Sequence, residues 1–333
     1  MINIVRICLY ALLLFSLTGC EKALIKDPVE SPVAVFEKLW SVMDARYAMF
    51  DYKQTDWPEI YRKYRPMITA QTSNDELFRV CSEMLAVLKD GHVALLAGER
   101  RFIYNGYYTS SPHNFNMEVL KKKYLPGMRY QGIVAYATSG KVGYLYIPSF
   151  REDLLATDMD LALQQLAHST SLIIDVRDNT GGGSAKVDAL TAQFMKEKML
   201  LKYDIYRKGP GHNDFYAPIA KYLSPQNNAW TGIPVFVLVN KRCFSSCNDF
   251  VLYMSQLTNV KLVGDQTGGG GGTPFDYELP NGWLLKYSAS MAISPEGENI
   301  EDGISPDYRV SNSLEDDSQE RDAIFQFAFD KLQ

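Results

Sequence analysis

The stretch that decides the fold is Pro234-Val235-Phe236-Val237-Leu238-Val239, which continues through Asn240-Lys241-Arg242 into Cys243-Phe244-Ser245-Ser246-Cys247. Its first half is apolar without a polar interruption, which is the pattern of a buried parallel strand. The polar break ends the strand, and the amphipathic segment that follows predicts a helix. Ser245 therefore stands where a strand passes into a helix, a position that can hold a hydroxyl both exposed and rigid.

A second interpretation of this position is that Ser245 or Ser246 simply caps the helix, which is the usual role of serine there. The residues around Ser245 do not form the Gly-x-Ser-x-Gly elbow of α/β hydrolases, so that fold is disfavoured. Other segments must decide between a cap and a nucleophile.

The whole chain excludes several classes of protein. It has 333 residues, a net charge of −5 and no Lys/Arg run longer than Lys121-Lys122-Lys123, which argues against a nucleic-acid partner. It has neither His-x-x-x-His nor paired Cys-x-x-Cys spacing, so we expect no metal and no cofactor.

Residues 1–20 read as a lipoprotein signal peptide. Arg6 precedes an apolar run from Ile7 to Leu17 that is too short to span a bilayer, and Leu17-Thr18-Gly19-Cys20 resembles a lipobox in which Cys20 is lipidated. A plain secretory signal is the alternative. Residues 21–31 then read as a tether, and the protein is expected in the bacterial cell envelope, lipid-anchored to a membrane.

Apolar residues at helix spacing predict a helical N-terminal domain over residues 32–92. One helix follows Ser31-Pro32, and a second follows the capping box Ser73-Asn74-Asp75-Glu76. The turn Lys89-Asp90-Gly91-His92 ends this domain. Residues 93–140, without a clear period after the short strand Val93 to Leu96, are expected to form a connecting region of strands and loops.

Residues 141–333 alternate between strand and helix patterns, which predicts an α/β catalytic core with a mainly parallel sheet. Further strands are expected at Val260 to Val263 and Trp283 to Met291, and a last helix from Glu320. The earlier elements are expected at Lys141 to Ile147 (strand), Asp153 to Ala167 (helix), Ser171 to Val176 (strand) and Ser184 to Met199 (helix).

Two further segments could carry chemistry. Asp175 to Gly183 places three glycines after a buried strand and before a helix, where free N–H groups could bind a developing oxyanion, although a tight turn is the simpler interpretation. His92 is one of four histidines and, taken alone, reads as a solvated turn residue.

Together these segments resemble the C-terminal processing (tail-specific) serine peptidases and their relatives in the tricorn core. Leu88 to Val93, Asp175 to Gly183, Val239 to Asp249 and Asp302 to Asp307 each look like a family block, in family order. The resemblance implies a crotonase/ClpP-like core, a small helical N-terminal domain and protein or peptide substrates. Only some 45 residues separate Leu96 from Lys141, so we expect no complete PDZ domain.

The resemblance implies a nucleophile at Ser245 and an oxyanion hole from the amides of Ser246 and one of Gly181 or Gly182. Many members activate the serine with a lysine 25 residues downstream, but here that position (245 + 25) is Gly270. The tricorn-like branch uses a histidine at the place held by His92, which we therefore expect to be the general base.

The third catalytic residue is less closely defined. Glu301 is preferred because it directly precedes the Asp302-Gly303-Ile304 block, and Glu298 is the alternative. Gly91 stands where the tricorn-like branch has a serine, and Asn248 stands where the family usually has a glutamate.

The expected function is therefore a lipid-anchored serine peptidase that acts on protein tails or peptides through a Ser-His acyl-enzyme mechanism. The alternative is a non-catalytic peptide- or glycan-binding surface lipoprotein with a peptidase-like fold. A third option is an esterase or amidase that uses the same dyad on a small molecule.

Overall fold

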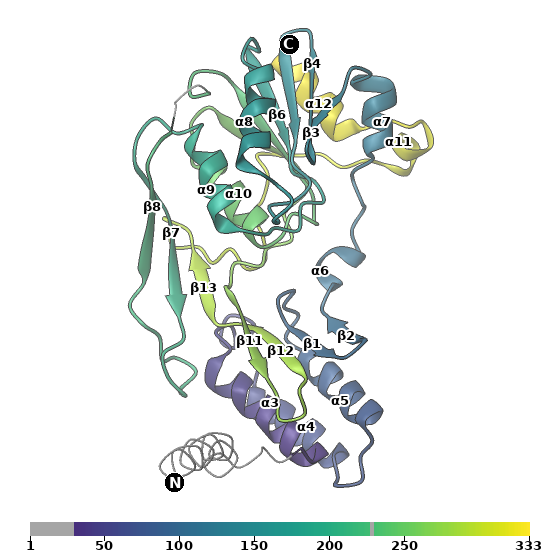
Figure 1. Ribbon diagram of the computed structural model, residues 1–333, viewed down its shortest axis with the longest axis vertical. Helices are drawn as coiled ribbons and strands as arrows, with labels where there is room; N and C mark the ends of the chain where they lie inside the picture. The colour runs from purple at the N-terminus through teal and green to yellow at the C-terminus, as the bar shows by residue number, and fades with distance from the viewer. Residues whose placement is uncertain (1–29, 227–229) are drawn as a thin grey trace, which may run out of the picture.

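The computed structural model describes residues 30–226 and 230–333 (Figure 1). The signal peptide expected at 1–20, the lipidated Cys20 and nearly all of the tether expected at 21–31 lie outside the described residues. Within the described part of the chain, no helix is both long enough and apolar enough to cross a membrane.

The largest sheet has seven strands in the order β14-β10-β9-β6-β5-β4-β3. The strands from β14 to β5 are parallel, and β4 and β3 pair antiparallel at one edge. All five residues of β6 and of β9 are buried, which explains their uninterrupted apolar sequences. The strands are β3 Arg129–Gln131, β4 Val134–Ser139, β5 Val142–Tyr146, β6 Ser171–Asp175, β9 Val235–Val239, β10 Val260–Gly264 and β14 Tyr308–Arg309.

Helices cover both faces of this sheet (Figure 1). Leu172 and Ile174 of β6 pack in one core with α8, α9 and α10, whereas Ile173 packs in a second core with α12, because successive side chains of a strand point to opposite faces. The helices are α8 Ala156–Gln165, α9 Ser184–Ala192, α10 Ser246–Ser255 and α12 Ala323–Leu332, with short turns α7 Met117–Val119, η2 Leu120–Tyr124 and α11 Leu314–Ser318.

The N-terminal helices form a separate core with a small sheet that the later chain completes. Strands β11 and β12 pair with β1 and β2 in the order β11-β12-β1-β2, and Leu285 of β12 is buried among the helices. Residues 274–288, expected within the catalytic core, therefore pack against the N-terminal helices (Figure 1). The elements are α3 Pro32–Arg46, α4 Trp57–Tyr64, η1 Arg65–Met67, α5 Asn74–Ala86, β1 Ala94–Ala97, β2 Arg100–Ile103, α6 Gly106–Thr109, β11 Pro274–Glu278 and β12 Leu284–Ser288.

The two N-terminal helix starts follow the sequence prediction. The Ser31 hydroxyl accepts a hydrogen bond from the Ala34 amide at 3.2 Å, and the Ser73 hydroxyl accepts one from the Glu76 amide at 3.2 Å. Each serine thereby satisfies one of the free N–H groups at a helix start.

Three expected elements differ from the structure. The helix expected at 184–199 ends at Ala192, and Met199 begins a strand of a three-stranded sheet in the order β13-β7-β8. The single strand expected at 283–291 is two strands that belong to different sheets. The last helix starts at Ala323 rather than Glu320, because Glu320 has a φ of +51° and Asp322 caps the helix. The bounds are β7 Met199–Tyr206, β8 Ile219–Leu223 and β13 Ser290–Ile293.

Candidate active site

Ser245 lies between β9 and α10 in a strained backbone conformation. Its φ is +58° and its ψ is −129°, a combination that costs energy for any residue with a side chain. The Ser245 amide donates to the Gly269 carbonyl at 2.9 Å, which ties this conformation to the glycine-rich loop. The Ser245 side chain makes no capping hydrogen bond, so the simple cap interpretation does not describe it.

His92 contacts Ser245 although the two residues lie far apart in the sequence. Its Nε2 lies 2.9 Å from Ser245 Oγ, although 153 residues separate the two. The ring also packs against Phe244, with ring centroids 4.8 Å apart. Burial lowers the pKa of His92 below its ordinary value, and the charge of Asp90 opposes this shift. The ring is therefore mostly neutral at pH 7 and can accept a proton.

The turn that carries His92 is held by a buried carboxylate. Asp90 is fully buried; its Oδ1 accepts from the His92 amide at 2.7 Å, and its Oδ2 accepts from the Ser288 hydroxyl at 2.8 Å. Ser288 is the last residue of β12, so the returning strand of the N-terminal sheet fixes the position of the histidine turn. From the sequence, Asp90 was predicted only to lie in a turn. No local pattern indicated its contact with Ser288, which lies 198 positions later in the chain.

Glu301 is buried beside this turn but does not contact the histidine. Its Oε2 accepts from the Gly271 amide at 3.0 Å, and its Oε1 lies 3.3 Å from Lys53 Nζ. Burial, followed by the charge of Asp90, raises the pKa of Glu301 to about 8, while Lys53 acts in the opposite direction. Among the described residues, no hydrogen bond joins Glu301 to His92 or Ser245, and His92 Nδ1 is buried without a partner.

The alternative carboxylate, Glu298, lies at the surface. It is exposed, and its amide donates to the Ser294 hydroxyl at 3.3 Å. Of the two glutamates that the sequence indicated, only Glu301 lies in the buried cluster with Asp90 and Lys53.

The three expected oxyanion donors differ in availability. The Gly181 amide donates to Asn179 Oδ1 at 2.9 Å, and the Gly182 amide donates to Ser246 Oγ at 2.8 Å. The Ser246 amide, at the first position of α10, has no hydrogen-bond acceptor within residues 30–226 and 230–333. In this conformation one of the three donors is therefore free to bind a substrate oxygen.

Ser245 lies on the wall of a cavity of about 310 Å³ that has a charged lining. Lys202 Nζ lies 3.0 Å from Asp249 Oδ2 and 3.0 Å from Asp204 Oδ1. These residues come from β7 and α10. No element was predicted between Met199 and Pro234, and Asp249 was noted only as the end of a family block. Within the described parts of the chain, no group of His, Cys, Asp and Glu side chains is arranged to hold a metal ion.

Comparison with known proteins gives this geometry a family. The model for peptidase family S41 matches residues 141–310, and the model for the tricorn protease C1 domain matches residues 28–86. The chain belongs to peptidase family S41. It is thus a member of a serine-type peptidase family, and the S41 match contains Ser245 and the glycine loops around it.

Curated relatives of this S41 chain include proteins from Staphylococcus aureus strain COL and Staphylococcus haemolyticus strain JCSC1435 that carry the name "Probable CtpA-like serine protease". Each is 27% identical, over 53% and 54% of this chain respectively. The chain spans about a third of the length of these relatives, 35% in each case.

Solved structures also resemble the S41 chain. A candidate peptidase from Parabacteroides merdae is 36% identical, with a TM-score of 0.86 over 91% of this chain and 97% of that one. Mature CPAF complexed with lactacystin has a TM-score of 0.70 at 13% identity, covering 91% of this chain and 98% of CPAF. The tricorn protease has a TM-score of 0.58 at 17% identity, covering 91% and 36%. The last two likenesses concern the fold alone.

Residue 270 of this S41 chain, where the family resemblance would place a lysine, is a glycine, and the lysines that line the Ser245 cavity form ion pairs. Gly270 has a φ of +78°, and a β-carbon on it would lie 2.4 Å from Phe244 Cε2, so a lysine there would displace that ring. Lys202 lines the Ser245 cavity, but its two carboxylate partners raise its pKa and keep it protonated despite its burial. Lys221 is bound to Asp188 at 2.7 Å.

Asn248, in the first turn of α10, joins two segments of the chain. Its Nδ2 donates to the Ile300 carbonyl at 3.0 Å, and its Oδ1 accepts from the Thr267 hydroxyl at 2.6 Å. The residue is fully buried, so these two bonds satisfy an amide that would otherwise be costly to bury. Asn248 therefore joins the helix that follows Ser245 to the segment around Glu301.

Proposed function

We propose that the chain hydrolyses peptide bonds in protein tails or peptides, with Ser245 as nucleophile and His92 as general base. The observation that carries this proposal is the 2.9 Å separation between His92 Nε2 and Ser245 Oγ. A serine hydroxyl is a weak nucleophile at neutral pH unless a base within hydrogen-bond distance accepts its proton. The lowered pKa of His92 keeps that base unprotonated.

The reaction proceeds in two halves. Ser245 Oγ attacks the peptide carbonyl carbon and transfers its proton to His92 Nε2, and the C–N bond then breaks as His92 protonates the leaving amine. The ester that remains is hydrolysed by water, whose proton passes to His92 as the water oxygen attacks. Collapse of that second intermediate returns the proton to Ser245 Oγ and releases the new carboxyl terminus.

The charge on the tetrahedral oxygen needs hydrogen-bond donors. The free Ser246 amide is the first, because it lies at the positive end of the α10 dipole. The Gly182 amide is the second proposed donor; it would have to exchange its bond to the Ser246 hydroxyl, which also donates to the Gly182 carbonyl at 2.6 Å, for one to the substrate. The Gly181 amide, which is bound to Asn179 in its own loop, serves to shape that loop.

We assign the carboxylates different positions in this mechanism. Asp90 orients the histidine turn and favours the imidazolium that forms during the reaction. Glu301, the third member expected from the family resemblance, supports the Gly271 loop through its hydrogen bond instead of contacting His92. Its effect on the reaction is then indirect, through the loop that holds Ser245.

Covalent labelling by a fluorophosphonate probe tests the dyad directly. Wild-type protein should be labelled and should cleave an unstructured peptide, whereas Ser245→Ala should be neither labelled nor active. His92→Ala should lose labelling by a factor of about 10³ or more. The matched control is Ser318→Ala, an exposed serine in α11. Labelling that persists in Ser245→Ala would remove Ser245 from this role.

One set of contacts favours a second function, a non-catalytic peptide- or glycan-binding role. The Gly181 and Gly182 amides are engaged and His92 Nδ1 has no partner, a state in which the site is not fully assembled for catalysis. Micromolar peptide binding without labelling or hydrolysis would support this role. Hydrolysis of small esters but not of peptides would support an esterase.

We further propose that Cys20 carries a lipid that anchors the protein in the cell envelope. The lipobox-like Leu17-Thr18-Gly19-Cys20 supports this location. Palmitate labelling in a bacterial host should be lost in Cys20→Ala, and the variant protein should move from the membrane fraction to the soluble fraction. Membrane retention of an unlabelled variant would contradict the lipid anchor.

A further inference from the structure

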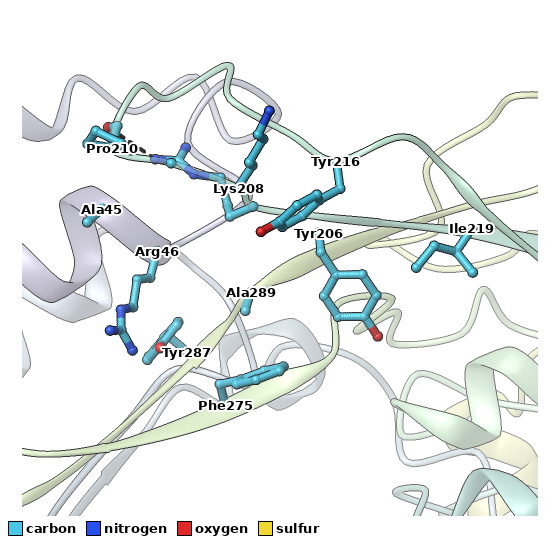
Figure 2. A pocket seen from close by; sticks show the side chains of 12 residues that line it. Ala45, Arg46, Tyr206, Lys208, Pro210, Tyr216, Ile219, Phe275, Tyr287 and Ala289 are labelled. Atoms are coloured by element: carbon cyan, nitrogen blue, oxygen red, sulfur yellow. Dashed lines mark hydrogen bonds between the residues drawn. The ribbon is translucent and has the colours of Figure 1, made fainter.

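A second cavity, of about 610 Å³, lies where the β7–β8 hairpin meets the end of α3 and strands β11 and β12. Figure 2 shows Tyr206, Tyr216 and Phe275 around this hollow, with Arg46 extending from α3. Tyr216 is 54% exposed, Ile219 57% and Phe275 47%. Grouped apolar side chains this exposed on a soluble protein commonly mark a binding surface.

Three cations lie at the edge of the same cavity. Arg46, Arg207 and Lys208 line it, and no Asp or Glu does. Within residues 30–226 and 230–333, none of the three forms an ion pair with a carboxylate. Arg207 donates to the carbonyls of His212 at 2.6 Å, Asp44 at 3.0 Å and Pro210 at 3.5 Å, and its Nε is buried without a partner. The charges of Asp44, Asp214 and Asp51 act on Arg207, so the cations available to a ligand are Arg46 and Lys208.

Nearby carboxylates are already engaged elsewhere. Asp44 Oδ1 lies 2.9 Å from His212 Nε2, and Asp214 Oδ2 accepts from the Gly211 amide at 3.1 Å. Arg46 stacks over the Tyr277 ring at 5.3 Å, which leaves its hydrogen-bond donors available. The cavity therefore combines an apolar floor with cations at its edge, a pairing that suits an apolar group next to a carboxylate.

Strand β7 connects this cavity to the candidate active site. Lys202, Asp204 and Tyr206 alternate along β7 and line the cavity of Ser245, and Tyr206 also lines the larger cavity together with Lys208. Pro274 lines the first cavity and Phe275 the second. At about 3.3 Å per residue, the path from Asp204 to Lys208 is on the order of 13 Å, the span of about four residues of an extended peptide.

We propose that this cavity is a substrate-recognition site that binds a large apolar side chain and an adjacent carboxylate of the same polypeptide whose scissile bond lies at Ser245. This inference rests on the proposed peptidase function and names the substrate class. The anchor therefore lies several residues from the scissile bond. The carboxylate is supplied either by the chain terminus or by an Asp or Glu side chain, since both offer the same group to Arg46 and Lys208.

Binding can be measured independently of hydrolysis in the Ser245→Ala protein. Fluorescein-labelled peptides of ten residues would be titrated and followed by anisotropy: one ending in Phe with a free carboxylate, one ending in Phe-amide, one with an internal Phe-Glu pair, and one with Phe replaced by Ala. We expect the first or the third peptide to bind at least tenfold more tightly than the Ala peptide. Tighter binding of the peptide that ends in Phe identifies the chain terminus as the source of the carboxylate. Tighter binding of the peptide with the internal Phe-Glu pair identifies an acidic side chain.

Variants then place the binding in the cavity. Phe275→Ala should weaken the preferred peptide about tenfold, and Arg46→Ala should remove the preference for the acid over the amide. Lys208→Glu, an exposed change that does not disturb the core, should reverse that preference. The matched controls are Leu155→Ala and Lys141→Ala, an exposed apolar residue and an exposed cation elsewhere on the chain. Unchanged binding in all three cavity variants overturns the proposal.

Hydrolysis separates this proposal from the function on which it rests. In an otherwise wild-type protein, Phe275→Ala should raise KM for the ten-residue peptide and leave kcat/KM for a short chromogenic peptide unchanged. Absence of any hydrolysis contradicts the peptidase function, whereas the anisotropy series still tests the cavity. If chitooligosaccharide or peptidoglycan fragments bind in a Phe275-dependent way and the peptides do not, the polypeptide assignment is wrong.

Discussion

Phe244 fills the space that Gly91 leaves beside the candidate base. A β-carbon on Gly91 would lie 2.6 Å from Phe244 Cζ and 2.8 Å from Tyr107 Cε1. The Phe244 ring in turn packs between His92 and Tyr107, with ring centroids 4.8 Å and 4.5 Å away. The glycine before His92 is therefore linked sterically to the residue before Ser245.

Gly91→Ser should lower activity even though the tricorn-like branch carries a serine at this place. The new side chain must push Phe244, and a shift of the residue before Ser245 disturbs the 2.9 Å contact with His92. We expect a loss in kcat of about 10²-fold, the effect of a displacement on the order of 1 Å. Measurement of kcat for Gly91→Ser, Phe244→Leu and the double variant tests this link. If the losses in kcat of the two single variants add up in the double variant, the steric link is contradicted.

A lysine placed at Gly270 should not replace the histidine. Its β-carbon would lie 2.4 Å from Phe244 Cε2, and the φ of +78° disfavours any side chain at this position. The double variant His92→Ala/Gly270→Lys should remain inactive across pH 7 to 10 in the peptide assay. Gly270→Ala is the control for backbone strain alone, and activity recovered specifically by lysine would show that the site still accommodates an amine base.

The acid limb of the pH–rate profile should lie below pH 6.5. Burial lowers the pKa of His92, so the imidazole stays neutral, and able to accept the Ser245 proton, to a lower pH than an exposed histidine. Activity is then full above the lowered pKa and is lost as the pH falls through it. Measurement of kcat/KM from pH 4 to 8 gives the midpoint, and a midpoint above 6.5 would contradict the assignment.

Asp90→Asn tests the charge that opposes this shift. The asparagine Oδ1 can still accept from the His92 amide, and its Nδ2 can donate to the Ser288 hydroxyl oxygen, but the negative charge is removed. The acid limb should therefore move to a still lower pH while kcat falls, because the imidazolium formed in the reaction is less stable. A limb that does not move would show that Asp90 acts through geometry alone.

The sequence predicted the parts of this site that depend on local pattern. The apolar runs of β6 and β9 lie side by side in the sheet, and the chain turns at Ser245 as the strand-to-helix pattern indicated. The His92 pairing came from resemblance, since no periodicity links residues 153 positions apart. Strands β7, β8 and β11 were missed because their partly exposed residues do not show a continuous apolar run.

The division of residues 283–291 between two sheets was also beyond local pattern. Ser288 ends a strand that pairs with β11 and β1, and Ser290 begins one that pairs with β7. Both segments favour strand, so only the tertiary partners decide where one ends. The same partners bring Asp90, Ser288 and Glu301 together, and these buried contacts explain why the carboxylates could not be ranked from the sequence.

Glu301→Gln should remove a pH dependence of stability. The pKa of Glu301 is raised from 4.5 to about 8 in the folded protein, so the folded state holds a proton that the unfolded state releases. The protonated Glu301 side chain thereby adds to the free energy of unfolding. This addition is fully present below pH 4.5 and is lost as the pH rises to about 8, at about 1.4 kcal/mol per pKa unit. Relative to wild type, the Gln variant should gain stability over this window, as measured by urea denaturation at each pH.

Glu298→Gln is the matched control for that experiment, because Glu298 is an exposed glutamate three residues away. Its stability curve should run parallel to that of the wild-type protein from pH 4.5 to 9. If the Glu301→Gln curve is also parallel, then Glu301 is ionised at neutral pH and forms a full ion pair with Lys53.

Asp322→Asn should destabilise the fold because it removes one partner of a buried ion pair. Arg177 and Asp175 are fully buried, Asp322 is 1% exposed, and Arg177 Nη1 lies 2.9 Å from Asp322 Oδ1. Asparagine can still cap α12, where Asp322 Oδ1 accepts from the Phe325 amide, but it cannot balance the buried guanidinium. We expect the free energy of unfolding to fall by about 3 kcal/mol, the usual cost when one partner of a buried ion pair is removed.

Urea denaturation measures this loss, with Asp276→Asn as the control. That variant breaks the exposed pair with Lys286 and should change the midpoint of unfolding little. Equal midpoints for the two variants would mean that Asp175 alone balances Arg177.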